Sequence, residues 1–307
     1  MTLSDTSKDQ PGVSIVIPTY NHEAFLGAAL RSVVNQTYTN WEAIVVNNFS
    51  TDGTEALVHS FNDPRIKLVN FHNNGIIGAA RNQGINLATN SFVAFLDSDD
   101  TWLPTKLEKC VAALMNGADL VCHGENWIDE TSYSRAVFYG PTARATYLSL
   151  LFRGNRLSTS ATVVRTSILK TVGGFSENSK FVTAEDYEMW LKISRITTNL
   201  VFIDEILGNF TRHGASASSS VVKHLHAEIS VVNHHAKQLP NSFATTLRLR
   251  HRQAKAYYSA GRSSSRGGQI RSALKYFVTA IKTSPLFVRS YAAIILLFVD
   301  QIKARVQ

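Results

Sequence analysis

The chain has 307 residues, of which 44% are hydrophobic and 18% charged, and its net charge is +8. These proportions are typical of a globular protein and exclude a disordered one, and no apolar run is long enough to span a bilayer. The two cysteines, Cys110 and Cys122, lack metal-ligand spacing and indicate ordinary thiols of a reducing compartment. Residues 1–11 are predicted to be disordered and contain no secretory signal, so we expect a cytoplasmic protein.

The first hundred residues alternate between apolar runs and amphipathic stretches. Strands are predicted at residues 13–17, 41–46, 65–69 and 91–96, and helices at 23–36 and from Gly75 onward. Strands separated by helices of this length are typical of a parallel, doubly wound sheet, which binds ligands beyond the carboxyl ends of its strands. Polar residues follow three of the predicted strands at that edge: Thr19 to Asn21, Asn47 with Asn48, and Asp97 to Asp100.

The most specific of these clusters is Asp97-Ser98-Asp99-Asp100, which directly follows an apolar strand. Three carboxylates at one corner of a sheet repel one another unless a cation lies between them. Oxygen ligands with one intervening residue suit Mg²⁺ or Mn²⁺, and these ions also take phosphates as ligands. The motif therefore predicts a metal site for a phosphorylated substrate. The alternative is an acidic turn that caps the helix starting near Pro104.

Six segments, taken in order, resemble glycosyltransferase family 2. They are VSIVIPTYN, Asn35 to Tyr38 with Trp41-Glu42, VVNNFSTDGT, Asn74-Gly75, Ala80 to Gly84, and FLDSDD with Trp102. The resemblance covers residues 12–213 and implies a GT-A fold, which is an α/β nucleotide-diphospho-sugar transferase fold with a Rossmann-like, mostly parallel sheet. It implies a nucleotide-binding half at 12–103 and an acceptor half at 104–220.

The resemblance also implies an activity. A member of this family is expected to move a sugar, with inversion, from a nucleoside diphosphate donor to a hydroxyl acceptor. We expect a UDP-linked donor, and as acceptor a growing surface polysaccharide or a lipid-linked glycan.

In the nucleotide-binding half, the resemblance places Thr19 and Tyr20 at the base. The family has an acidic residue where this chain has Asn48. Because an amide both donates and accepts hydrogen bonds, Asn48 can still bind a pyrimidine edge, and whether it alters base preference stays open. Arg81 is expected over the base or the diphosphate, the alternative being a solvated arginine.

The metal, Mn²⁺ or Mg²⁺, is expected to be bound directly by Asp99. Asp97 would contact the ribose, or the metal through water, and His213 is a further candidate contact to metal or phosphate. The metal would neutralise the charge that develops on the departing diphosphate. Trp102 completes the predicted substrate-binding set, and residues 216–220 are expected to form a loop that closes over the donor.

Glu185 and Asp186 lie at the first turn of a predicted helix, where acidic side chains suit the helix dipole. Simple helix capping is therefore one interpretation. By resemblance, Asp186 is the general base that deprotonates the acceptor hydroxyl, and Glu185 orients the acceptor or acts as an alternate base.

Residues 221–307 are predicted to form a basic helical extension. They hold 14 lysines and arginines and two acidic residues, a net of +12, so residues 1–220 carry −4. The apolar stretch 286–299 is too short to span a bilayer and resembles an interfacial helix. We expect peripheral contact with anionic lipid at the inner face of the plasma membrane and no nucleic acid partner, while a solvated bundle is the alternative. The predicted lipid-facing cations are Arg248, Arg250, Arg252, Lys255, Arg262, Arg266 and Arg271.

Interpretations from other functional classes account for this sequence less well. A non-catalytic nucleotide-sugar-binding or scaffold protein would not need an intact set of Asp97, Asp99 and Asp186, which this chain retains. A nicotinamide oxidoreductase needs G-x-G-x-x-G after the first strand, where this chain has Pro18-Thr19-Tyr20-Asn21. The sequence therefore favours a metal-dependent glycosyltransferase.

Overall fold

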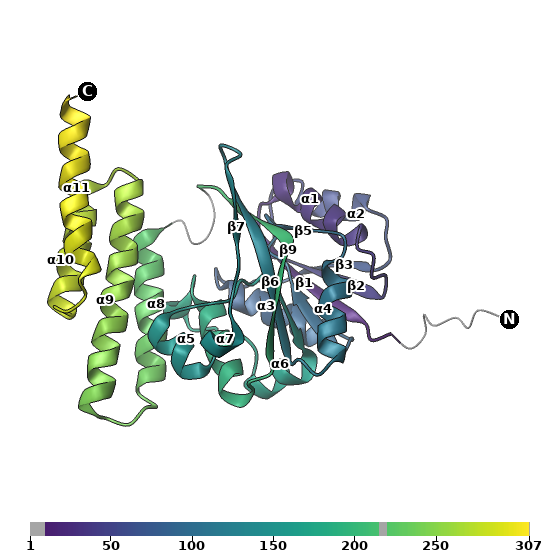
Figure 1. The fold of residues 1–307 in the computed structure, drawn as a ribbon. Helices are drawn as coiled ribbons and strands as arrows, with labels where there is room; N and C mark the ends of the chain where they lie inside the picture. The colour runs from purple at the N-terminus through teal and green to yellow at the C-terminus, as the bar shows by residue number, and fades with distance from the viewer. Residues whose placement is uncertain (1–9, 215–219, 307) are drawn as a thin grey trace. The chain divides into compact units, whose positions relative to one another are not determined.

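The computed structural model describes residues 10–214 and 220–306, with side chains described as far as Val299. Most of the predicted disordered segment 1–11 and of the predicted loop 216–220 lies outside the described residues. The chain divides into two compact units (Figure 1). The first unit comprises residues 1–147, 156–177 and 188–214, and the second comprises 148–155, 178–187 and 215–307.

A nine-stranded sheet runs through the described part of the first unit, in the order β3-β2-β1-β4-β8-β6-β9-β5, with β7 paired to β6. The pairs β2–β3, β1–β2 and β1–β4 are parallel, which confirms the predicted doubly wound arrangement of the first four strands. The strands are β1 Val13–Thr19, β2 Trp41–Asn47, β3 Ile66–Asn70, β4 Phe92–Phe95, β5 Thr101–Trp102, β6 Leu120–Asp129, β7 Ser134–Val137, β8 Thr162–Arg165 and β9 Leu200–Arg212.

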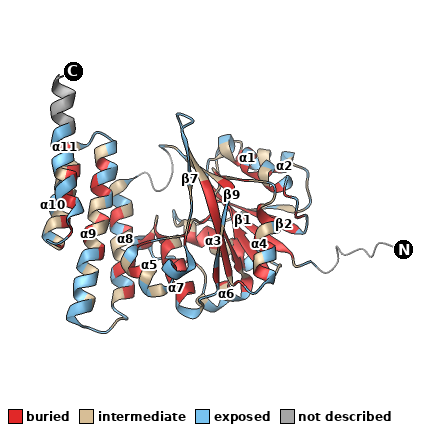
Figure 2. Cartoon of the chain, viewed as in Figure 1, coloured by how far each residue is buried: buried red, intermediate tan, exposed pale blue. Residues whose placement is uncertain are grey.

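Helices cover both faces of this sheet because its central strands are apolar on both faces. Leu30 of α1 and Leu107 of α4 belong to the core cluster on one face, and Ala80 of α3 packs against Ile44 and Val46 on the other. Figure 2 shows the buried strands between helices whose outer surfaces are exposed. The helices of this unit are α1 Glu23–Val34, α2 Thr54–Ser60, α3 Ile77–Leu87, α4 Lys106–Met115, α6 Thr166–Val172 and α7 Glu185–Ile196, whose first turn belongs to the second unit.

Close packing of α3 on β1 depends on a glycine. A Cβ built on Gly84 would lie 2.4 Å from Cγ1 of Val16, so a larger residue there would push the helix off the sheet. Since α3 carries Arg81, this contact also sets the depth at which that arginine lies.

The second unit is helical, as predicted for the extension. Its helices are α5 Tyr147–Arg153 (apart from Tyr147), α8 Val221–Ala236, α9 Phe243–Arg266, α10 Ile270–Thr283 and α11 Arg289–Val306. At Gly261 of α9 a Cβ would lie 2.5 Å from the ring of Phe277, so α9 and α10 approach closely there. None of the helices in the described residues combines the length and the apolar character needed to cross a bilayer.

Candidate active site

Hydrogen bonds join the loops that follow β1 and β2 into one rim at the carboxyl edge of the sheet. The backbone N–H of Asn48 donates to the carbonyl oxygen of Thr19 at 3.0 Å, and the N–H of Asn21 donates to Oγ of Ser50 at 2.9 Å. Oδ1 of Asn21 accepts from the N–H of Thr51 at 2.8 Å. The predicted convergence of these two polar clusters is therefore confirmed.

The orientation of the Asn48 amide follows from its contact with the loop after β3. The backbone N–H of Asn73 donates to Oδ1 of Asn48 at 3.0 Å. A backbone N–H can only donate, so the amide oxygen must face Asn73 and the NH₂ group must point the other way. Asn48 thus presents a hydrogen-bond donor at the position where a carboxylate would present an acceptor.

Exposed aromatic side chains lie along the same rim. The rings of Phe49 and His72 stack with centroids 4.0 Å apart, and both residues are exposed, as is Tyr20. Phe49 has a φ of 53°, a left-handed conformation that costs a non-glycine residue about 1 kcal/mol. Such a pair offers a flat surface of the kind on which bases stack. Sequence reasoning missed Phe49 and His72, although a large aromatic residue within a turn-rich loop was a usable signal.

The acidic motif brings four predicted residues together. Nε2 of His213 lies 2.9 Å from Oδ2 of Asp99, and Nη2 of Arg81 donates to Oδ1 of Asp97 at 2.8 Å. The Phe25 ring stacks on His213 with centroids 4.6 Å apart. Burial raises the pKa of Asp99, and the neighbouring Asp97 charge raises it further, which is the crowding that the sequence predicted. Arg81 is 3% exposed and is not a solvated arginine.

Asp100 and Trp102 support the motif from inside the unit. Asp100 is 1% exposed and accepts hydrogen bonds from Oγ of Ser160 at 2.5 Å and from the N–H of Thr211 at 2.9 Å. Trp102 is 4% exposed, and its indole N–H donates to the carbonyl oxygen of Ser160 at 2.8 Å. The two residues fasten the motif to β9 and to the segment just before β8, and the substrate contact predicted for Trp102 stays a prediction.

The donor set at this corner fits a hard divalent cation. The side chains of Asp97 and Asp99 are 27% and 16% exposed, so both carboxylates are accessible to an ion and to its other ligands. The fit to Mg²⁺ or Mn²⁺ comes from the carboxylate oxygens, because the imidazole of His213 is a ligand type better suited to Zn²⁺, Cu²⁺, Fe²⁺ or Ni²⁺. Within the described ranges no three His, Cys, Asp or Glu side chains form a ready cluster for a metal. Substrate oxygens would therefore complete the coordination.

Glu185 and Asp186 differ in their surroundings within the second unit. Glu185 is 5% exposed, and its carboxylate accepts a hydrogen bond from the backbone N–H of Thr183 at 2.7 Å. Asp186 is half-buried, and its Oδ2 accepts from Nδ2 of Asn155 at 3.3 Å. Of the two carboxylates, Glu185 is committed to the start of α7, while Asp186 is the more accessible.

The basic extension supports this turn of α7. Arg252 of α9 donates to Oε1 of Glu228 at 2.6 Å, and its guanidinium lies 5.7 Å from the ring of Tyr187. The hydroxyl of Tyr187 donates to the carbonyl oxygen of Leu150 at 2.8 Å. The prediction that Arg252 faces lipid is wrong, because the residue is 1% exposed and is covered by these partners from other helices.

Comparison with known proteins adds a family and relatives to this geometry. Residues 14–168 match the sequence model of Glycosyl transferase family 2, and residues 92–301 match that of Glycosyl transferase family group 2. The UDP-Glc:alpha-D-GlcNAc-diphosphoundecaprenol beta-1,3-glucosyltransferase WfgD of Escherichia coli is 37% identical over 182 residues, which are 59% of this chain and 69% of WfgD. An uncharacterized glycosyltransferase of Rickettsia typhi is 33% identical over 224 residues, covering 70% of this chain and 68% of that relative.

Two solved structures share the fold. S. aureus TarS 1–349 in complex with UDP-GlcNAc aligns with a TM-score of 0.64 and 20% identity, over 92% of this chain and 83% of that one. The mannosyltransferase PcManGT from Pyrobaculum calidifontis, in complex with GDP-Man and Mn²⁺, aligns with a TM-score of 0.61 and 17% identity, over 94% and 80%. The predicted GT-A fold is thereby confirmed.

Proposed function

This chain belongs to glycosyl transferase family 2, and on that premise we propose that it transfers a sugar, with inversion, from a UDP-linked donor to a hydroxyl of a lipid-linked glycan or growing polysaccharide. The observation that carries the proposal is the corner formed by Asp97, Asp99 and His213, beside a rim of polar and aromatic side chains. The names of WfgD and of the TarS complex support a UDP donor.

In this proposal the rim binds the nucleotide. Thr19 and Tyr20 line the base, and the stacked Phe49 and His72 extend its aromatic wall. The outward NH₂ group of Asn48 donates to a base carbonyl, which uracil provides. The nucleotide-binding half spans residues 12–103 and the acceptor half 104–220.

Asp99, Asp97 and His213 would hold Mn²⁺ or Mg²⁺, which when bound neutralises charge on the departing diphosphate. Arg81, which is buried, holds Asp97 in place through its ion pair. The sequence predicted Arg81 over the base or the diphosphate, and we propose in addition that it positions Asp97.

Asp186 is the proposed general base, and Glu185 shapes the turn that presents it. The acceptor hydroxyl gives its proton to Asp186 while its oxygen forms a bond to the anomeric carbon. The bond from that carbon to the diphosphate breaks, and the diphosphate leaves with the bonding electrons. Attack from the side opposite the leaving group inverts the anomeric centre.

A lipid-linked acceptor would require the protein to work at a membrane. We propose that it acts at the inner face of the plasma membrane, held there peripherally by the basic extension 221–307, whose net charge is +12.

The decisive experiment is calorimetry of the purified protein with UDP-glucose, UDP-GlcNAc, GDP-mannose and dTDP-glucose, each with Mn²⁺ and with EDTA. We expect a UDP sugar to bind in the presence of Mn²⁺ and to lose most of its affinity in EDTA. A protein that takes up none of these donors with metal would instead be a scaffold of this fold, and the proposal would fall.

A further inference from the structure

The outward side of α11 is apolar where a helix of a globular protein is normally polar. Among its described side chains, Arg289 to Val299, every exposed position apart from Arg289 is apolar. Leu286 and Val288, just before the helix, are 80% and 71% exposed. We define the outer face of α11 by its large exposed residues together with the two that precede the helix: Leu286, Val288, Tyr291, Ile295, Leu296, Phe298 and Val299.

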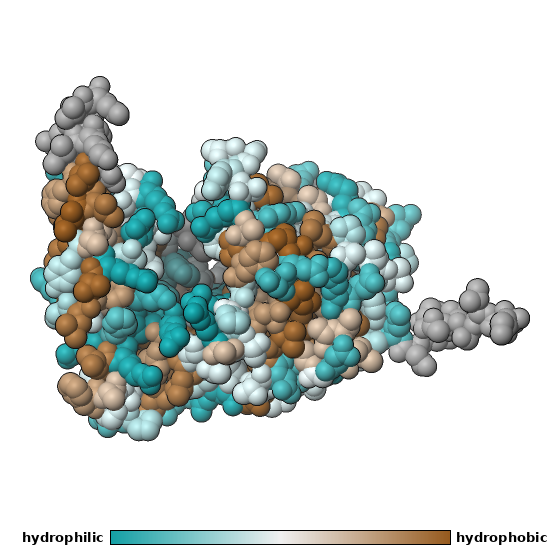
Figure 3. All heavy atoms as spheres, viewed as in Figure 1, coloured by the Kyte–Doolittle hydropathy of each residue, from teal (hydrophilic) through white to brown (hydrophobic). Residues whose placement is uncertain are grey.

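Packing within the second unit does not need this outer face. The opposite side of α11 supplies Ala293 and Leu297, which cluster with Ala273 and Phe277 of α10. The helix is thus apolar on its buried side and on its exposed side. Figure 3 shows apolar side chains gathered over α10 and α11. Exposed apolar groups in such a continuous set mark a surface that another body covers.

The charge of the extension distinguishes between two partners that could cover the outer face of α11, a second copy of the chain and a lipid leaflet. The sequence contains no acidic residue between Ile229 and Val299, and exposed cations lie on α10 and at the first residue of α11. A second copy of the same extension would bring a second charge of +12 to the contact, which repels. An anionic lipid leaflet would attract the cations and accept the apolar side chains. The exposed cations of α10 and the start of α11 are Arg271, Lys275, Lys282 and Arg289.

We propose that the outer face of α11 inserts into the interfacial region of an anionic lipid leaflet, with these four cations at the headgroups. The inference deepens the proposed function, on which it rests for the membrane-bound acceptor, by naming the surface and the way in which it binds. It also changes what the extension does: α11 meets lipid, whereas α9 supports the first turn of α7 through Arg252.

Point substitutions test this better than truncation, because removing residues 221–307 would also remove Arg252 from Tyr187. The test variant is Ile295→Ser with Phe298→Ser, two residues that are 64% and 54% exposed. The matched control is Phe243→Ser with Leu247→Ser on α9, two exposed apolar residues outside the outer face. Thermal melting followed by circular dichroism checks that both double variants stay folded.

Full-length protein is sedimented with vesicles of phosphatidylcholine alone or mixed with phosphatidylglycerol. We expect tight binding to the mixed vesicles, weakened by salt, and a loss of about tenfold or more in the Ile295/Phe298 variant. The Phe243/Leu247 control should bind like the parent. The proposal is overturned if the parent does not prefer the mixed vesicles, if the test variant binds as the parent does, or if the control loses as much.

Two further measurements separate the outcomes. Light scattering after gel filtration that shows a dimer, dissociated in the Ile295/Phe298 variant, would assign the outer face to a second copy and also overturn the proposal. Calorimetry with UDP-glucose and Mn²⁺ on the same samples tests the proposed function independently. A parent that binds vesicles but no donor would leave the lipid surface standing and remove the transferase assignment. A parent that binds the donor but not the vesicles would keep the transferase assignment and overturn the lipid surface.

Discussion

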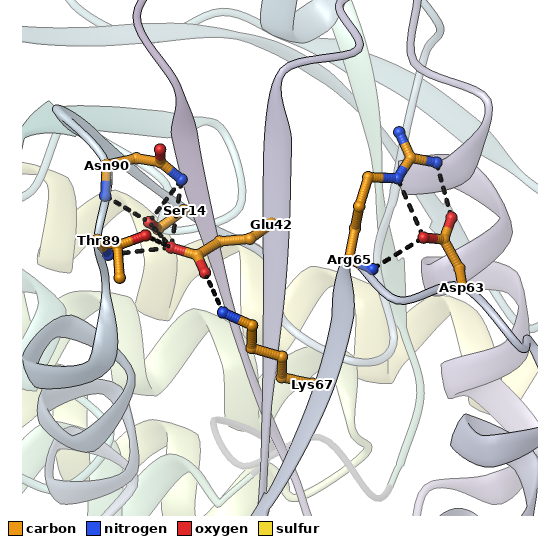
Figure 4. Close-up of polar contacts among 7 residues, drawn as sticks. All are labelled: Ser14, Glu42, Asp63, Arg65, Lys67, Thr89 and Asn90. Atoms are coloured by element: carbon orange, nitrogen blue, oxygen red, sulfur yellow. Dashed lines mark hydrogen bonds and ion pairs between the residues drawn. The ribbon is translucent and has the colours of Figure 1, made fainter.

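Replacing Glu42 by glutamine should reduce the acid-sensitive part of this protein's stability. Glu42 lies near the start of β2, and its side chain is 9% exposed. Its carboxylate accepts hydrogen bonds from Oγ of Ser14 at 2.7 Å, from Oγ1 of Thr89 at 2.7 Å and from Nζ of Lys67 at 2.8 Å (Figure 4). One side chain thereby ties together β1, β2, β3 and the loop before β4.

The magnitude follows from the pKa of Glu42. Burial acts to raise this pKa, but the hydrogen bonds from Lys67, Ser14 and Thr89 outweigh it and lower the pKa from 4.5 to about 2. At 1.36 kcal/mol per pKa unit this is about 3 kcal/mol, which we reduce to about 2 kcal/mol because Lys67 is half-exposed and its charge is screened. Because the folded pKa is lowered, the contribution is complete above pH 4.5 and is lost as the pH falls towards 2.

Urea unfolding followed by circular dichroism, at several pH values from 7 down to 3, measures the free energy of unfolding of the parent and of the variant. At pH 7 the Glu42→Gln variant should be about 2 kcal/mol less stable than the parent, and the gap should narrow as the pH falls below 4.5. The control Glu55→Gln, at an exposed position on α2, should change stability by no more than about 0.5 kcal/mol. A gap that stays constant across this pH range would refute the reasoning.

Four further substitutions test the site. Asp99→Ala should abolish the Mn²⁺-promoted part of UDP-sugar binding in calorimetry, and undiminished binding would exclude it as a metal ligand. Asp186→Asn should retain donor binding and lose about a hundredfold or more in transfer rate, so normal transfer would remove it from the base role. Asn48→Asp should raise the ratio of UDP affinity to CDP affinity about tenfold. The reason is that a carboxylate accepts a hydrogen bond from the ring N–H of uracil but repels the lone pair of the ring nitrogen of cytosine. An unchanged ratio would place the base elsewhere. Arg252→Met should cost about 3 kcal/mol in urea unfolding by leaving Glu228 without its buried cation, and a loss below about 1 kcal/mol would contradict that pairing.

The sequence alone determined the first four strands, the helices after the first and third of them, and the corner at which the acidic motif lies. These are properties of short segments. An apolar run of fixed length predicts a buried strand, and polar residues directly after it must lie at the carboxyl edge. Thr19, Asn48 and Asp97 were therefore placed correctly at that edge before any distance was known.

Only the tertiary structure decided which polar side chains are covered, and by what. Arg252 was expected on the surface and is buried against Glu228, 24 residues away, while Trp102 is held by Ser160, 58 residues away. Phe49 and His72 meet only because two loops lie side by side. Whether a polar group can be buried depends on whether a distant segment supplies its hydrogen bonds. The free energy of that burial therefore cannot be read from the local sequence pattern. Local periodicity can therefore place an element and its edge, but the role of a charged or aromatic side chain depends on the partner that folding brings to it.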